Sequence, residues 1–154
     1  MNYYLHVGDI PKAEEEFDRI EVYVSKYGSS GYIEKYYEAE ILFLKGNYIG
    51  ALEKFKEFKG VNVFFSKDIL ENKIAQCYVN LQEPDKASKV LEDRLLLNPY
   101  QASAHLLLAQ ILIDDNKNNE ARDHLIIANQ VWENADESYG LAREAEDLLA
   151  GIEE

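Results

Sequence analysis

The feature that most constrains this chain is a small residue that recurs at nearly regular intervals. Alanine stands at positions 13, 51, 87 and 121, so the intervals are 38, 36 and 34 residues. Each alanine follows a turn-forming segment and precedes a bulky apolar residue by four positions. Because small residues let two helices approach closely, the pattern predicts repeated helical hairpins. The four pairs are Ala13 with Phe17, Ala51 with Phe55, Ala87 with Leu91, and Ala121 with Leu125.

A second small residue marks the other helix of a hairpin. Ala39, Ala75 and Ala109 each lie twelve positions before the next recurring alanine. A hairpin of this kind cannot bury both of its faces alone, so successive copies must stack. No alternating run bounded by hairpin turns is present, and the best strand candidate, Val61–Phe65, has no second run to pair with. We therefore predict an all-α fold and interpret Val61–Phe65 as a connector.

Turn and helix-stop residues divide the chain into segments of ordinary helix length. The last segment is amphipathic, with Leu141, Ala145 and Leu148 recurring at helical spacing opposite Glu144 and Asp147. Such a helix suits the open end of a stack, where one face must meet solvent. The breaks lie at Gly8–Pro11, Gly28–Gly31, Lys45–Asn47, Gln82–Pro84, Asn98–Pro99 and Asn116–Asn119.

These repeats resemble the tetratricopeptide repeat family, whose unit is a helix–turn–helix of about 34 residues with small residues at the helix crossing. Residues 46–52 resemble the family's turn and second helix, and Leu97-Asn98-Pro99 resembles its usual repeat ending. The family's tryptophan near the start of the first helix is missing from every copy. The resemblance implies one domain over residues 1–154, a right-handed α-solenoid of stacked antiparallel hairpins. Its expected repeats are 1–29, 32–65, 68–99 and 102–134, with a capping helix at 135–152.

The charge balance excludes two classes of partner. The chain has 29 Asp and Glu against 16 Lys and Arg, a net charge of −13. A surface so negative repels phosphate backbones and anionic lipid headgroups, so we expect no nucleic-acid or membrane partner. The single cysteine, Cys77, cannot form an internal disulfide or a multi-thiolate metal site. We expect a cytoplasmic protein, with a fragment of an exported protein as the alternative.

No catalytic constellation emerges from the sequence, and we expect no enzyme, cofactor or metal. His6, His105 and His124 lie far apart and form no zinc-binding motif. The oxygen-rich segment Asp114–Glu120 lacks the glycine and the final glutamate of a calcium loop, so we interpret it as a turn followed by a helix cap. A helical enzyme assembled from distant His and Glu residues is the least favoured alternative.

The family resemblance directs attention to the concave surface formed by the first helix of each repeat. Amides there suit an extended peptide backbone, and tyrosines offer large contact area at low entropy cost. Glu40 disfavours an acidic tail, so we expect a hydrophobic or basic segment of a partner protein, or of the parent chain itself. An equally weighted alternative assigns Tyr36, Tyr37 and Phe43 to the core. The candidate contact residues are Tyr36, Tyr37, Glu40, Phe43, Asn72, Lys73, Gln76, Asn80, Leu106 and Gln110.

Together these patterns predict a non-enzymatic protein-interaction module that binds a partner's peptide or helix in the concave groove. The alternative is an architectural or self-associating domain of a larger protein, and a homo-oligomer fits that alternative. The first copy has lost most of its first helix, which favours a chain cut from a longer protein near Met1.

Overall fold

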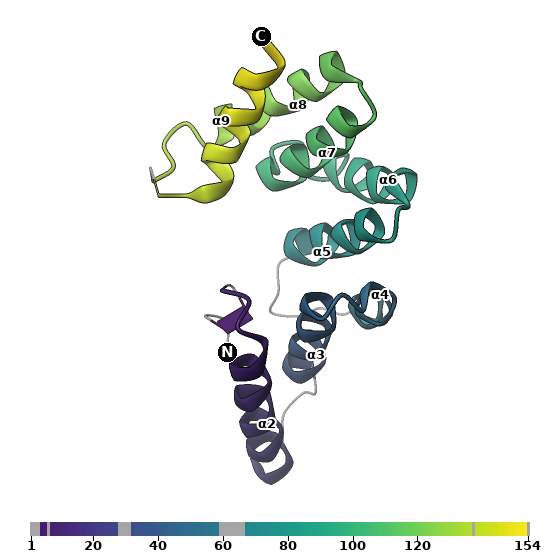
Figure 1. Ribbon diagram of the computed structural model, residues 1–154, viewed down its shortest axis with the longest axis vertical. Helices are drawn as coiled ribbons and strands as arrows, with labels where there is room; N and C mark the ends of the chain where they lie inside the picture. The colour runs from purple at the N-terminus through teal and green to yellow at the C-terminus, as the bar shows by residue number, and fades with distance from the viewer. Residues whose placement is uncertain (1–3, 6, 28–31, 59–66, 137, 154) are drawn as a thin grey trace. The chain divides into compact units, whose positions relative to one another are not determined.

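The computed structural model describes residues 4–5, 7–27, 32–58, 67–136 and 138–153, and its secondary structure in these ranges is helical (Figure 1). The predicted all-α fold is therefore confirmed. The chain divides into two compact units, residues 1–66 and residues 67–154, which we describe separately. The expected turn at Gly28–Gly31 and the connector Val61–Phe65 lie outside the described residues. The organisation as one domain stays a prediction.

The first unit contains three helices. They are α2 (Ile10–Tyr27), α3 (Tyr32–Leu44) and α4 (Tyr48–Glu57). Helices α3 and α4 pack as a hairpin, and α2 packs against α3. Its core includes Phe55, which is fully buried, and Phe58, which is 2% exposed.

The second unit contains two hairpins and a closing helix. Helix α5 (Lys67–Asn80) pairs with α6 (Pro84–Leu95), and α7 (Ala102–Asp114) pairs with α8 (Asn118–Val131). Helix α9 (Gly140–Glu153) packs against α8 and α7. Because α7 contacts both α5 and α9, the first helices of successive hairpins lie side by side.

The recurring alanines lie where the helices cross. All seven of them, four in second helices and three in first helices, are fully buried. Phe55, Leu91 and Leu125, each one turn after its alanine, are fully buried as well, whereas Phe17 is half-buried. The spacing rule read from the sequence is thus confirmed as a packing rule. The buried alanines are Ala13, Ala39, Ala51, Ala75, Ala87, Ala109 and Ala121.

Four turns, one before α2 and one in each of the three hairpins, share the same backbone geometry. Gly8, Gly46, Gln82 and Asn116 have φ values of 70°, 76°, 61° and 60°, in the left-handed region. Each stands five residues before its recurring alanine. Around Gln82, the Gln82 N–H donates to the Val79 carbonyl at 3.0 Å and the Glu83 N–H donates to the Tyr78 carbonyl at 2.9 Å, which is a Schellman motif. The other three turns repeat this pair of hydrogen bonds.

Gln82 is the least suited of the four residues to this backbone conformation. Glycine adopts it without steric cost and asparagine tolerates it, but a glutamine Cβ crowds the following carbonyl. We expect Gln82→Gly to raise the free energy of unfolding by about 0.5–1 kcal/mol, measured by urea denaturation. Asn116→Gly, the matched control, is expected to raise it less. A lower denaturation midpoint for Gln82→Gly would contradict the assignment.

The closing helix α9 covers the end of the last hairpin. Ala145 is fully buried against the α7–α8 core, and Leu148, Leu149 and Ile152 pack on the same cluster. Leu141 belongs to the expected apolar face but is 39% exposed. The buried face of α9 therefore begins at Ala142, which is 7% exposed, and Leu141 lies outside it.

Candidate protein-interaction surface

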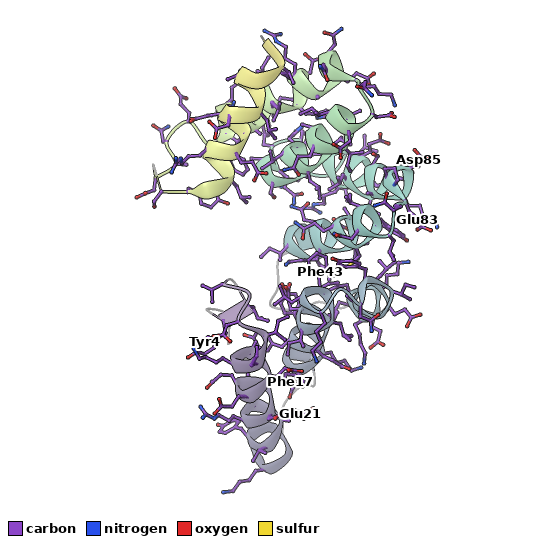
Figure 2. The ribbon with its side chains drawn as sticks, in the orientation of Figure 1. Tyr4, Phe17, Glu21, Phe43, Glu83 and Asp85 are labelled. Carbon is purple, nitrogen blue, oxygen red and sulfur yellow. The ribbon has the colours of Figure 1, made fainter. Side chains whose placement is uncertain are left out.

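The predicted contact residues all lie on first helices of hairpins, and they divide between the two units. Tyr36, Tyr37, Glu40 and Phe43 belong to α3, and Phe43 is labelled on that helix in Figure 2. The remaining six belong to unit 2, on α5 and α7. They are Asn72, Lys73, Gln76, Asn80, Leu106 and Gln110.

On α3, the residues nearest the helix centre face the core. Tyr36 is 9% exposed and its ring lies edge-on to Phe55 and Phe58, with centroids 5.9 and 6.4 Å apart. Its hydroxyl donates to Glu40 Oε1 at 2.7 Å, and Glu40 is 6% exposed. Burial, followed by the nearby Glu40 carboxylate, raises the pKa of the Tyr36 hydroxyl. Both side chains therefore stabilise the α3–α4 hairpin, and their part in partner binding stays a prediction.

Two other aromatic side chains of α3 are less deeply buried than Tyr36. Tyr37 is half-buried, and its ring contacts the Tyr36 ring edge-on with centroids 6.0 Å apart. Phe43 is half-buried as well and meets Tyr48 at the start of α4, with centroids 5.3 Å apart. Helical spacing alone could not separate Phe43 from Tyr36, since the two residues lie seven positions apart and so share one face of the helix.

The three amides of α5 recur every four residues along the helix, and the first of them contacts α7. Asn72 is half-buried and its Nδ2 donates to the Ser103 hydroxyl of α7 at 2.7 Å. Its Oδ1 is buried and has no hydrogen-bond partner in the part of the chain that the structure describes. Asn80 is exposed and donates to the Gln76 carbonyl at 2.8 Å, while Gln76 and Lys73 are half-buried.

Helix α7 continues the same surface toward α9. Gln110 is half-buried and its Nε2 donates to Glu144 Oε1 of α9 at 2.7 Å. Leu106, by contrast, is 3% exposed and belongs to the core between α7, α8 and α9. The structure therefore brings Asn72, Gln76, Asn80 and Gln110 onto one run of adjacent helices and places Leu106 beneath it.

Two histidines that the sequence separates by 19 residues meet in the last hairpin. The Nδ1 atoms of His105 and His124 are 2.7 Å apart, and His105 Nε2 lies 2.9 Å from the Pro99 carbonyl. A carbonyl only accepts, so His105 carries its proton on Nε2 and accepts at Nδ1 from the His124 Nδ1–H. His105 is buried, and the contact between the two rings joins α7 to α8.

This pair makes stability depend on pH above the range in which carboxylates titrate. Burial, with the neighbouring His105, lowers the pKa of His124 below its usual value of 6.5, and the opposing Asp123 and Glu120 offset this only in part. The unfolded chain therefore binds more protons than the folded chain as pH falls through 6.5, which favours unfolding. We expect the urea midpoint of unit 2 to fall between pH 7.5 and about 5.5, and to fall less in His124→Gln. An equal fall of the urea midpoint with pH in the parent protein and in His124→Gln would contradict this account.

A polar network at the other end of the α5–α6 hairpin was missed by sequence reasoning. The Arg94 side chain is 13% exposed, its Nε donates to Gln101 Oε1 at 3.0 Å and it lies 3.4 Å from Glu71 Oε2. Three helices thus meet at one guanidinium. A signal did exist: Arg94 stands seven residues after Ala87, on the buried stripe where the neighbouring repeats have Phe58 and Ala128.

The oxygen-rich segment after α7 is a turn, as expected. Asn116 has the left-handed conformation and Lys117 pairs with Asp115 at 2.5 Å. The helix-cap part of that interpretation is wrong, because the residue at the N-cap of α8 is Lys117, whose side chain makes no capping hydrogen bond.

Nothing among the described side chains assembles into a metal site of three or more His, Cys, Asp or Glu. Cys77 is fully buried in α5, the setting of a structural thiol. In the described part of the chain, no helix combines the length and the apolar character needed to cross a bilayer.

The chain matches no protein-family model, and no curated protein matches it. A solved structure is similar: SycD, the type III secretion translocator chaperone of Yersinia enterocolitica. The similarity has a TM-score of 0.72 at 18% identity, and it covers 81% of this chain and 93% of SycD. At this identity the likeness concerns the fold alone. The chain therefore shares with SycD an all-helical fold.

Proposed function

We propose that this chain is a non-enzymatic protein-binding module that holds a segment of a partner protein against the first helices of its hairpins. The observation that carries the proposal is the side-by-side placement of α5, α7 and α9, with amide side chains on α5 and α7. The expected partner segment is hydrophobic or basic, from another protein or from the parent chain.

The amides on these helices have the chemistry to bind a peptide backbone. An amide side chain offers one acceptor and two donor hydrogens, so it matches both the N–H and the C=O of an extended chain. Asn72 Oδ1 is buried and has no hydrogen-bond partner among the described residues, so the amides of Gln76 and Asn80 are the ones on α5 that a ligand can reach. Half-buried side chains such as Gln76 and Gln110 also lose less freedom on binding than exposed ones.

The similarity to SycD is consistent with this function. SycD is a chaperone for type III secretion translocators, so its work is the binding of other proteins. Proteins that share a fold often bind different ligands, so the similarity supports a class of partner and not a particular one.

Peptide selection tests the proposal. We expect the full chain to enrich a defined apolar or basic peptide from a random display library, and Gln76→Ala combined with Asn80→Ala to weaken that peptide's binding about tenfold. The matched control, Gln130→Ala with Asn134→Ala, changes two amides in and after α8 and is expected to leave affinity unchanged. No enrichment, or equal loss in both variants, would reject this surface.

Self-association is the second candidate, because the crystallised form of SycD is an alternative dimer. Sedimentation velocity at several concentrations distinguishes self-association from peptide binding by a monomer. A concentration-dependent dimer without any selected peptide favours self-association, and a monomer with a selected peptide favours the module.

A further inference from the structure

The second helices of unit 2 carry a groove that the proposed function does not use. Two adjoining cavities of about 270 and 690 Å³ run along α6, from the α5–α6 turn to the C-terminal end of that helix. They share Asp85, Ser88, Leu112 and Lys117 in their walls, so they form one continuous groove, which we call the α6 groove. Asp85, labelled in Figure 2, lies at the N-terminal end of α6.

The floor of the α6 groove is apolar. Leu108 and Leu112 of α7 and Leu95 of α6 lie along it, and Leu96 at its end is 80% exposed. Leu97 and Tyr100, which follow Leu96, are 77% and 74% exposed. Leu96 lines the groove and so extends its apolar floor to an exposed side chain, an arrangement typical of an interaction site.

The walls of the α6 groove are acidic. Both lysines in the walls are already paired with carboxylates of the groove, Lys89 with Asp93 at 2.8 Å and Lys117 with Asp115 at 2.5 Å. His124, in the wall near Glu120, adds little positive charge at neutral pH because burial lowers its pKa. Six carboxylates therefore face two lysines, and they belong to Asp85, Glu92, Asp93, Asp114, Asp115 and Glu120.

We propose that the α6 groove binds a basic amphipathic helix of a partner protein. An apolar strip between charged walls matches a helix with one apolar stripe flanked by Lys or Arg, because their apolar stems cover the strip while their charged ends reach the carboxylates. Helix α6 has 12 residues and is about 18 Å long, so three turns of a partner helix span the groove. A second copy of this chain, with net charge −13, is repelled by the same walls.

The test uses a fluorescent synthetic helix of about 14 residues, with leucine on one face and lysine elsewhere, and a matched peptide with glutamate in place of lysine. Fluorescence anisotropy with the full chain is expected to detect the lysine peptide only. Glu92→Gln with Glu120→Gln is expected to weaken binding about tenfold, whereas Glu133→Gln with Glu146→Gln, an equal charge change on exposed residues elsewhere, changes it less than about twofold.

A second pair of variants tests the apolar contact. Leu96→Ser is expected to weaken binding about fivefold or more, and Ile49→Ser, on another exposed apolar residue, in α4, is expected to leave it unchanged. Equal weakening by both charge pairs would mean attraction to net charge, and would overturn the proposal. A dimer that Leu96→Ser dissociates, without peptide binding, would assign the groove to a second copy.

Different variants test the binding surface on the first helices and the α6 groove, so one can be rejected without the other. Gln76→Ala with Asn80→Ala alters α5 and is expected to leave the lysine peptide bound to the α6 groove. If that variant alone abolished binding of the lysine peptide, the peptide would lie on the first helices and the α6 groove would be rejected.

Discussion

Phe55→Ala is expected to lower the free energy of unfolding of unit 1 by about 3–5 kcal/mol. Phe55 is fully buried, and its ring lies edge-on to Tyr36 with centroids 5.9 Å apart. The alanine would remove the ring from the only hairpin of the unit's described residues and leave a cavity between α3 and α4. Native-state hydrogen exchange followed by mass spectrometry, on peptides from α3 and α4, measures the loss.

The same helix provides the control for Phe55. Glu53 is exposed, so Glu53→Ala is expected to change stability by less than about 0.5 kcal/mol. Trp132, in unit 2, reports by its fluorescence whether that unit stays folded. Unchanged protection of α3 and α4 amides in Phe55→Ala would mean that Phe55 is not the centre of the unit 1 core.

Arg94→Ala has the second large expected effect, a loss of about 3 kcal/mol in the stability of unit 2. The guanidinium joins Glu71 of α5 to Gln101 at the start of α7, and its side chain is 13% exposed. Its removal leaves the carboxylate of Glu71, which is 21% exposed, without this cationic partner. Urea denaturation followed by Trp132 fluorescence measures the loss.

A double-mutant cycle isolates the pair. Glu71→Gln removes the carboxylate charge, so adding it to Arg94→Ala is expected to restore part of the lost stability. If the two changes simply add, the 3.4 Å contact carries no coupling and Arg94 stabilises the hairpin by packing alone.

The fold followed from the sequence because the recurring alanines have one physical use. A side chain larger than a methyl group does not fit where two helices cross, so the alanine positions recorded the crossings directly, and all seven are fully buried. The turns were readable for a related reason: Gly46 has a φ of 76°, a conformation that glycine adopts freely.

The candidate site was less predictable because register alone cannot separate a surface from a core. Tyr36 and Tyr37 are neighbours in α3, yet Tyr36 is 9% exposed and hydrogen-bonded to Glu40 while Tyr37 remains half-exposed. The contact of His105 with His124 depends on how α7 packs on α8, which no local pattern encodes. Charged residues on buried stripes, such as Arg94, are the better sequence signal for such networks.

The constant distance between each left-handed turn and its alanine belongs to a longer block of fixed length. From Ala39 to Phe55, from Ala75 to Leu91 and from Ala109 to Leu125 the number of residues is the same, so the intervals of 38, 36 and 34 differ only outside these blocks. An added residue inside a block would move its second alanine away from the helix crossing, whereas one between blocks would leave the internal packing of both in place.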